Sequence, residues 1–492
     1  MGIVMATGIP NSSKRGTTKR KSRLAVKPES FMGLVYDGKR SIEDILQTAP
    51  AVLKRLWPNS LETPSSALYY GDNLPILASL IRDETMRGQV RLIYIDPPYA
   101  TNSVFQSRSQ TEAYSDLLSG PAYLEFLRER LIFLRELLAS DGSLYVHLDE
   151  NMAFHVKVIM DEVFGPGNFR NWITRKKCNP KNYTRKTYGN VSDFILFYSK
   201  SDDYVWNRPL EGWTPERADR EYQYIEKETG RRYKRVPVHA PGTRNGATGQ
   251  VWRGMHPPPG KHWQYTPDKL DAMDARGEIY WSANGNPRRK VYLDESDGVP
   301  VQDIWLDFRD AHNQNINVTG YPTEKNPDLL ARIIAASSHP GDLVLDCFAG
   351  SGTTLDIAAQ LGRRWLGIDN SVEAVATILR RLAHGTQPMG DFVSDKKHSH
   401  VLDAHAATLP LFDMAQASID PVSPAGRRQP ITEFAIFSEF RQRTDIEGAV
   451  VEWRRFIEGE PTNRLVKDQS GAYKTKARSK PKRAPSTRKP RR

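Results

Sequence analysis

The chain has 492 residues, two cysteines and no run of 18 apolar residues, which excludes a membrane span, a disulfide framework and a zinc site built on cysteines. Its net charge of +12 is carried by the ends: residues 1–30 carry +6 and residues 470–492 carry +10, so residues 31–469 carry −4. Basic arms on a nearly neutral body favour a polyanionic partner, most often nucleic acid, over a role in solubility alone.

The predicted elements alternate between strands and helices. In the first half, we expect strands at 67–72, 91–96, 143–149, 169–175 and 194–200, with helices at 74–81, 122–139 and 152–164. In the second half, we expect strands at 342–348 and 364–369, with helices at 329–337, 353–361 and 372–382. This alternation predicts an α/β fold, with a largely parallel sheet covered by helices on both faces.

Several segments break this alternation. Residues 206–305 are rich in Trp, Tyr, Arg, Gly and Pro without a sustained period, which predicts an inserted domain with long loops. Residues 391–462 are predicted to be a linker that ends in an amphipathic helix near 449–457. Residues 1–30 and 463–492 contain too little apolar surface to offset the entropy of ordering, so both basic tails are predicted to be disordered.

The segment Asp96-Pro97-Pro98-Tyr99 directly follows the nearly all-apolar strand residues 91–95. Ligands of an open α/β sheet bind beyond the carboxyl ends of its strands. There, the Asp96 carboxylate and the Pro97 carbonyl could each accept one N–H of an exocyclic base amine and direct its lone pair at an electrophile. The prolines stiffen the turn, and Tyr99 offers a flat surface on which an extruded base can stack. These residues predict transfer of a group to a base amine.

A second strand runs into the glycine-rich turn Asp346-Cys347-Phe348-Ala349-Gly350-Ser351-Gly352, and a helix is predicted from Thr353. Glycines allow close backbone approach, and the helix N-terminus favours a carboxylate or phosphate. The next strand ends at Asp369, where a carboxylate is placed to hold the two hydroxyls of a ribose. A nucleoside that ends in a carboxylate fits both features, which predicts S-adenosylmethionine as the cofactor.

These motifs resemble the β (permuted) class of DNA amino-methyltransferases, the N-4/N-6 DNA methylase family that includes type III modification subunits and adenine-specific methylases. The resemblance covers roughly residues 34–385, and it is carried by stretches that match in order, at 70–74, 94–99, 142–149, 194–200, 320–325 and 345–354. It implies a Rossmann-like sheet of seven strands, circularly permuted, with an inserted target-recognition domain. The domains would then be a catalytic half at 31–205, the insert at 206–305 and a cofactor-binding half at 306–390.

The resemblance also assigns roles to residues. The implied catalytic residues are Asp96, Pro97, Pro98 and Tyr99. The implied cofactor-binding residues are Asp72, Thr323, Lys325, Asp346, Phe348, Gly350, Gly352, Thr353 and Asp369. This sequence departs from the family at three places: Ala100 replaces the usual Asn, Cys347 replaces the usual Pro, and Asn326 separates Lys325 from Pro327.

A basic loop next to the predicted sheet edge contains no acids and is expected to follow DNA phosphates. Its members are Arg175, Lys176, Lys177, Lys181, Arg185 and Lys186. We predict double-stranded DNA as the partner, and no metal and no membrane. The resemblance also allows a homodimer and a separate restriction subunit of a restriction-modification system.

We therefore expect a site-specific DNA methyltransferase that acts on N6 of adenine, because Asp is the commoner family form for adenine at the head of the tetrad. Transfer to N4 of cytosine stays open as an alternative. A non-catalytic DNA-binding protein with an inactive methylase core and a methyltransferase for RNA or small-molecule amines are alternatives of other classes. The substrate and the low cysteine count favour the reducing cytoplasm of a prokaryote or phage-infected cell, in association with the nucleoid.

Overall fold

The computed structural model describes residues 33–59, 64–98, 120–179, 186–308, 317–319, 321, 324–388 and 429–459. Within these ranges, no helix combines the length and apolar character that crossing a membrane requires.

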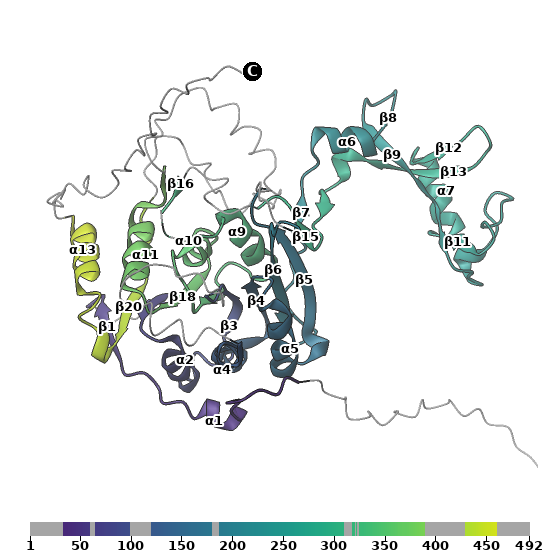
Figure 1. The fold of residues 1–492 in the computed structure, drawn as a ribbon. Helices are drawn as coiled ribbons and strands as arrows, with labels where there is room; N and C mark the ends of the chain where they lie inside the picture. Colours follow the sequence, from purple (N-terminus) through teal and green to yellow (C-terminus); the bar gives the residue numbers. More distant parts are fainter. Residues whose placement is uncertain are drawn as a thin grey trace, which may run out of the picture.

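A ten-stranded sheet forms the core (Figure 1), in the order β1-β20-β2-β18-β17-β3-β4-β6-β5-β15. In that order the strands are Leu53–Trp57, Ala435–Glu439, Ala67–Tyr70, Arg364–Asp369, Leu343–Asp346, Val90–Ile95, Leu138–Leu148, Ser192–Ser199, Phe169–Lys176 and Ile304–Trp305. The seven strands from β2 to β5 correspond to the predicted methyltransferase sheet. The neighbouring strands β2, β18, β17, β3 and β4 are parallel, and β6 runs antiparallel to both β4 and β5.

The permutation is visible in the strand order. Strands β17 and β18 come late in the chain, yet they lie between β2 and β3, which come early. Two strands that follow the insert in the chain thus lie in the middle of the sheet, between strands that precede it. This confirms the predicted permuted α/β methyltransferase fold.

Helices cover both faces of the sheet because its inner strands are apolar on both sides. Ile93 and Ile95 of β3 face one core, and Leu92 and Tyr94 face the other. The first face is covered by α1 (Ile42–Leu46), α2 (Asn73–Arg82), α4 (Gly120–Leu137) and α5 (Ala153–Phe164). The second is covered by α9 (Pro327–Ala336), α10 (Thr353–Gln360), α11 (Val372–His384) and α13 (Glu447–Glu458). Burial of one isoleucine side chain stabilises the fold by about 1.5–3 kcal/mol. The buried side chains of β3 therefore hold this strand, and the site residues that follow it, firmly in place.

The C-terminal segment adds more than the predicted helix. Residues 435–439 form β20, which pairs in parallel with β2 and antiparallel with β1 and so extends the sheet beyond the expected seven strands. Helix α13 then packs on α11, and Trp453 is buried in the core of that face.

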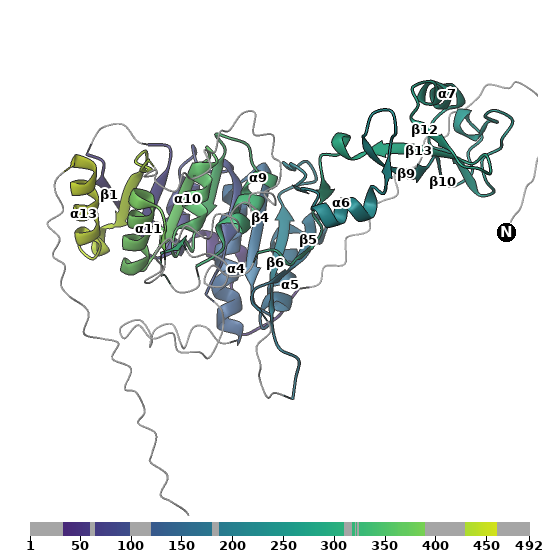
Figure 2. The same ribbon diagram turned by 90° about the horizontal axis from the view of Figure 1, so that it is seen from above.

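The insert leaves the core through a stalk formed by β7 (Leu210–Glu211) and β14 (Val299–Pro300), which pair antiparallel. Beyond the stalk lies a four-stranded sheet in the order β12-β13-β9-β8, with bounds Ile279–Trp281, Pro287–Tyr292, Arg232–Pro237 and Tyr224–Ile225. Helices α6 (Pro215–Glu221) and α7 (Pro267–Ala275) and the strand pair β10 (His239–Pro241) and β11 (Lys261–Trp263) complete it. Figures 1 and 2 both show this unit as an arm that extends away from the core.

The remaining short elements are the strand pair β16 (Asn317–Val318) and β19 (Gln387–Pro388) and the 3-10 helices η1 (Pro166–Asn168), η2 (Ala247–Gly249), η3 (Leu293–Glu295) and η5 (Phe440–Gln442).

Candidate active site

Four parallel strands end at one edge of the sheet, and each end carries predicted site residues. Asp96 follows β3, and the glycine-rich turn follows β17. Asp369 ends β18, and Asp72 follows β2. The register places Leu345 opposite Ile93, and Asp369 opposite Tyr70. The fold therefore brings together the two strand ends that the sequence singled out.

Asp96 forms an ion pair across the two halves of the site. Its Oδ2 lies 2.8 Å from the Nζ of Lys325, and the two side chains are 19% and 11% exposed. Lys325 comes just before α9 and therefore belongs to the part of the chain that follows the insert. Pro97 is buried and Pro98 is partly buried beside Asp96. The predicted site residues Tyr99 and Thr323 lie outside the described residues.

Asp346 holds the glycine-rich turn in place. Its Oδ1 accepts the backbone N–H of Phe348 at 2.9 Å, and its Oδ2 accepts the hydroxyl of Thr354 at 2.6 Å. Burial raises the pKa of Asp346 to about 7, against the lowering effect of these two hydrogen bonds. The carboxyl group of Asp346 thus connects the start of the glycine-rich segment with the first helical turn of α10.

The two glycines of this turn adopt conformations that other residues rarely reach. Gly350 has φ +51° and Gly352 has φ +75°, both in the left-handed region. A Cβ on Gly352 would also come within 2.8 Å of Cγ1 of Ile378. Gly352 sits at the N-cap of α10, whose first residue is Thr353. The backbone can therefore turn tightly here and lead directly into the start of α10.

Asp369 lies on the other side of the same turn. Its Oδ2 accepts the N–H of Gly350, and its Oδ1 accepts the N–H of Ser371, both at 2.8 Å. Burial raises the pKa of this carboxyl to about 6. Each carboxylate oxygen has a second lone pair, and the side chain is partly exposed. The free lone pairs of this carboxylate are suited to accept hydrogen bonds from the two hydroxyls of a ribose.

Asp72 joins the site through an arginine that the sequence analysis missed. Its Oδ1 caps α2 through the N–H of Leu74 and also accepts Nη2 of Arg130, each at 3.0 Å, while the side chain stays 54% exposed. The guanidinium of Arg130 lies 3.6 Å from the ring centre of Phe126, and Phe126 in turn contacts the ring of Phe348. The signal in the sequence was a charged residue within the apolar stripe of α4.

Asn73, also missed, ties α2 to the glycine-rich turn. Its amide donates to the carbonyl of Cys347 at 2.8 Å. Burial raises the pKa of the Cys347 thiol well above its usual value, so Cys347 acts as a packing residue rather than a nucleophile.

The predicted basic loop is corrected at its first member. Arg175 is 0% exposed, its Nη1 lies 2.8 Å from Oδ2 of Asp193, and its Nε donates to the carbonyl of Phe308 at 2.7 Å. A buried, paired guanidinium cannot reach a DNA phosphate, because moving it would break its ion pair with Asp193 in the core. Arg175 instead links β5, β6 and the chain that returns from the insert.

The other members of the basic loop stay predictions. Lys176 and Lys177 are partly exposed, Lys186 is exposed, and Lys177 lies 3.8 Å from Glu150. Lys181 and Arg185 lie outside the described residues.

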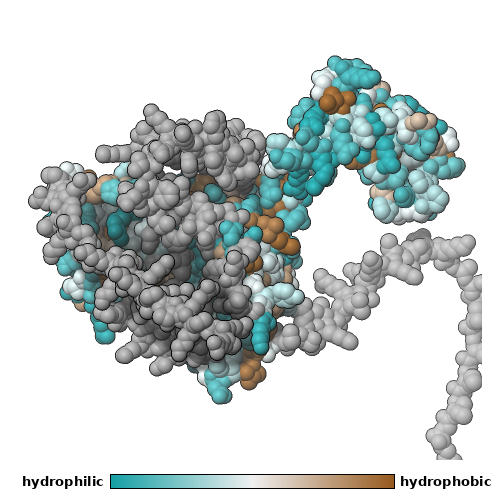
Figure 3. Space-filling view, turned by 45° about the horizontal axis from the view of Figure 1, so that its top comes forward, coloured by the Kyte–Doolittle hydropathy of each residue, from teal (hydrophilic) through white to brown (hydrophobic). Residues whose placement is uncertain are grey.

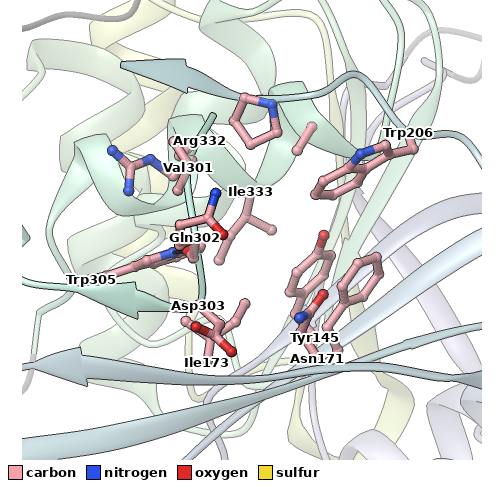
Figure 4. Close-up of a pocket in the computed structure, with 13 residues that line it drawn as sticks. Tyr145, Asn171, Ile173, Trp206, Val301, Gln302, Asp303, Trp305, Arg332 and Ile333 are labelled. Atoms are coloured by element: carbon pink, nitrogen blue, oxygen red, sulfur yellow. Dashed lines mark hydrogen bonds between the residues drawn. The ribbon is translucent and has the colours of Figure 1, made fainter. Parts of the chain in front are cut away.

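A cavity of about 180 Å³ lies at the junction between core and insert (Figure 4). Side chains of the core sheet, of α9 and of both ends of the insert surround it, including Tyr145, Trp206, Trp305 and Arg332. None of the predicted site residues lines it, so it is separate from the edge where Asp96 lies. The described part of the chain contains no group of His, Cys, Asp or Glu that could hold a metal ion.

Comparison with known proteins identifies relatives of this chain. A family model described as DNA methylase, of the N6/N4 type, matches residues 90–380. The type II methyltransferase M.EcaI of Enterobacter cloacae is 48% identical over 366 residues, which cover 73% of this chain and 80% of that protein. The Mod subunit of the type III restriction-modification enzyme StyLTI of Salmonella typhimurium is 27% identical over 321 residues, which cover 58% of this chain and 48% of that protein. A solved structure described as an M1.HpyAVI-SAM complex has 17% identity and a TM-score of 0.36, and the match covers 64% of this chain and 98% of that one.

Proposed function

The chain belongs to the DNA methylase family of the N6/N4 type, and we propose that it methylates N6 of adenine within a specific sequence of duplex DNA. Its cofactor is S-adenosylmethionine. The observation that carries the proposal is the position of Asp96 at the sheet edge, beside the turn held by Asp346 and Asp369. Asp at the head of the tetrad, the commoner form among adenine methylases of the resembled class, favours adenine over cytosine.

The catalytic segment makes a poor nucleophile reactive by orientation. The Asp96 carboxylate and the Pro97 carbonyl each accept one N–H of the base amine, so its lone pair points away from them and toward the cofactor side. The amine nitrogen gains positive charge as it forms the new bond and then gives up a proton. A carboxylate placed where positive charge develops stabilises the transition state more than the ground state.

Lys325 can act on both the catalytic carboxylate of Asp96 and the bound cofactor. In the structure its ammonium group compensates the charge of Asp96, and in the resembled family this position contacts the methionine end of the cofactor. Since a single ammonium group can donate three hydrogen bonds, Lys325 can contact Asp96 and a cofactor carboxylate together. It therefore positions the catalytic carboxylate relative to the bound cofactor.

The glycine-rich turn and Asp369 would hold the cofactor. The N–H groups at the start of α10 suit its carboxylate end, Asp369 suits its ribose, and Phe348 and Asp72 suit its adenine. When bound, the cofactor supplies a methyl group on positively charged sulfur, which is the electrophile of the reaction. The protein groups orient both reactants and need no covalent intermediate of their own.

The test is to identify the methylated base. Unmethylated genomic DNA is incubated with the full chain and cofactor, hydrolysed and analysed by mass spectrometry. We expect N6-methyladenine. N4-methylcytosine would replace this proposal with the cytosine alternative, and no methylated base would favour a non-catalytic DNA-binding protein.

Asp96→Ala tests in the same assay whether this carboxylate is catalytic. Loss of a group that acts mainly in the transition state costs roughly 3–5 kcal/mol, a turnover loss of two to four powers of ten. Cofactor affinity, measured by calorimetry, should stay within a few-fold of the wild type. Residual turnover above a tenth of the wild type would remove Asp96 from the catalytic role.

We also propose partners and a cellular compartment for this protein, from its relatives and its free cysteines. The relative named as a Mod subunit belongs to a restriction-modification enzyme, which supports a separate restriction subunit as partner, and a homodimer stays a proposal that light scattering can test. Cys178 and Cys347 are both free and buried, which fits the reducing cytoplasm, where the nucleoid offers the substrate.

A further inference from the structure

One face of the four-stranded sheet in the insert combines aromatic and basic side chains. Residues that pair directly across antiparallel strands lie on the same face, and here Arg235 pairs with Lys290, Tyr280 with Arg288, and Tyr224 with Tyr233. The opposite face carries Ile279 and Trp281, which pack in the small core of the insert. The aromatic-basic face consists of Tyr224, Tyr233, Tyr280, Tyr292, Arg235, Arg288 and Lys290, of which Tyr233 and Tyr292 are buried.

Arg235 is clamped at the centre of this face. Its guanidinium carbon lies 3.5 Å from the ring centre of Tyr224 and 3.4 Å from that of Tyr280. Two rings at this distance fix the plane of the guanidinium and leave its N–H edge as the side that can donate. The clamp therefore orients a planar donor before any partner arrives, which lowers the entropy that binding would cost.

The clamped guanidinium lacks the acidic partner that neighbouring cations have. Lys290 donates to Glu226 at 2.7 Å, Arg231 pairs with Asp294 at 2.8 Å, and Arg232 pairs with Asp219. Within the described residues, the only hydrogen bond of the Arg235 side chain runs from Nη2 to the hydroxyl of Tyr233 at 3.5 Å, and its Nε is buried without a partner. An oriented and unpaired guanidinium is suited to an acceptor outside the chain.

The position of this face also points to an external partner. Both ribbon views place β9, β12 and β13 on the arm, away from the methyltransferase core (Figures 1 and 2), and the arm surface is largely hydrophilic (Figure 3). Arg235 is thus not required to close the core. Since DNA is the substrate of this family, a base edge is the acceptor that a planar fork fits best.

We propose that Arg235 is a specificity-determining residue that reads a guanine of the recognition sequence through O6 and N7. The pair of parallel N–H groups of a fixed guanidinium matches these two acceptors in the major groove. Arg288, exposed on the same face and without a described acidic partner, contacts a neighbouring phosphate. This inference rests on the proposed site-specific methylation of DNA and adds the residue that selects the site.

The experiment compares methylation motifs. Full-length wild type, Arg235→Gln and Arg232→Gln each methylate the same unmethylated genomic DNA, and the sites are mapped by methylation-aware sequencing. Arg232 is the matched control, because it lies on the same strand, on the opposite face, and is already paired with Asp219. In Arg235→Gln, discrimination at one G·C position should fall about 5- to 150-fold while other positions are unchanged, whereas Arg232→Gln should keep the whole motif.

Arg235→Lys separates base recognition from folding. Lysine keeps the charge and the contact with both rings but loses the planar fork, so it should fold and relax the same single position. Arg288→Gln should lower affinity for all sequences alike and reduce the log–log salt slope by about 0.9. The proposal would be overturned if Arg235→Lys retained the complete methylation motif. It would also be overturned if Arg235→Lys lost DNA affinity equally for all sequences. A wild-type product at N4 of cytosine would overturn the adenine proposal and leave this test intact.

Discussion

At the residue scale, the carboxyl groups of Asp96, Asp346 and Asp369 gather at the sheet edge where we propose that a positively charged cofactor binds. Removal from water raises the pKa of Asp346, which is buried, and of Asp369, which is partly exposed. The nearby charges of Asp96 and Asp369 raise the pKa of Asp346 further. Like charges brought together away from water destabilise one another. A bound cation relieves this repulsion, so the cofactor should stabilise the fold as well as react.

The raised pKa of Asp346 predicts how stability depends on pH. A carboxyl whose pKa rises from its ordinary 3.8 to about 7 on folding stabilises the folded state below pH 4, and this contribution is lost as the pH rises to about 7. The loss amounts to at most about 4 kcal/mol. Asp346→Asn keeps an acceptor for Phe348 and cannot ionise, so it should lack this dependence.

The measurement is chemical unfolding of both proteins without cofactor at several pH values between 4 and 8. The stability of the wild type relative to Asp346→Asn should decline over this range. A difference that stays constant with pH would show that Asp346 is charged throughout.

Asp369→Ala should weaken cofactor binding more than turnover. Removing an acceptor for two ribose hydroxyls costs about 1.5–3 kcal/mol, a loss of roughly ten- to 150-fold in affinity. Because Asp369 also holds the N–H groups of Gly350 and Ser371, a modest loss of thermal stability should accompany it. Calorimetry measures the affinity, and near-normal turnover at saturating cofactor distinguishes a binding defect from a folding defect. An unchanged affinity would reject the ribose role.

The sequence could predict residues whose role follows from their place on a strand end. Asp96, Gly350, Gly352 and Asp369 belong to this group, because an apolar strand followed by a carboxylate or by glycines marks an edge. The pairing of Asp96 with Lys325 could not be predicted, since it depends on the tertiary position of residues from both halves. The burial of Arg175 was missed for the same reason: its acidic partner Asp193 lies on the next strand, beyond a run of basic residues.

At the element scale, the main strands were predictable and the added ones were not. Strand β3 shows a nearly continuous apolar run, whereas β20 consists of only five residues, AIFSE, that follow a long polar segment. Its pairing with β2 gives it structure, and that partner lies more than 360 residues earlier in the chain. Local pattern carries no information about such a contact.

The stalk predicts that the insert can be removed as a unit. Since β7 and β14 pair antiparallel, with Val299 opposite Glu211, residues 212–298 can be replaced by a short glycine-serine turn without separating core elements. The insert has its own hydrophobic core, so the main core loses little buried surface. We expect cofactor affinity within about threefold of the wild type and at least a hundredfold loss of DNA methylation.

The two measurements are calorimetric cofactor binding and methyl incorporation into genomic DNA. Loss of cofactor binding would show that the insert supports the core. Methylation that persists at the same sites would place sequence recognition elsewhere in the chain.

At the scale of the whole molecule, we assign recognition of the DNA sequence to the arm and electrostatic attraction of DNA to the two basic tails. The arm is largely hydrophilic (Figure 3) and carries the aromatic-basic face. The two tails carry charges of +6 and +10, whereas the residues between them carry −4. Contacts with phosphates position a protein on DNA but do not carry base information directly, and base edges supply the specificity. This division predicts that affinity and specificity can be changed separately.

Deleting residues 470–492 should lower DNA affinity without changing the methylated sequence. This segment carries ten basic and no acidic residues, and each phosphate contact that is lost should reduce the log–log salt slope by about 0.9. The measurement is binding of full-length and truncated protein to one cognate duplex across a salt series, with the methylated sites mapped for both. If the tail only keeps the protein in solution, the slope stays the same and aggregation alone increases. A changed methylation motif would show instead that the tail reads bases, and recognition would then not belong to the arm alone.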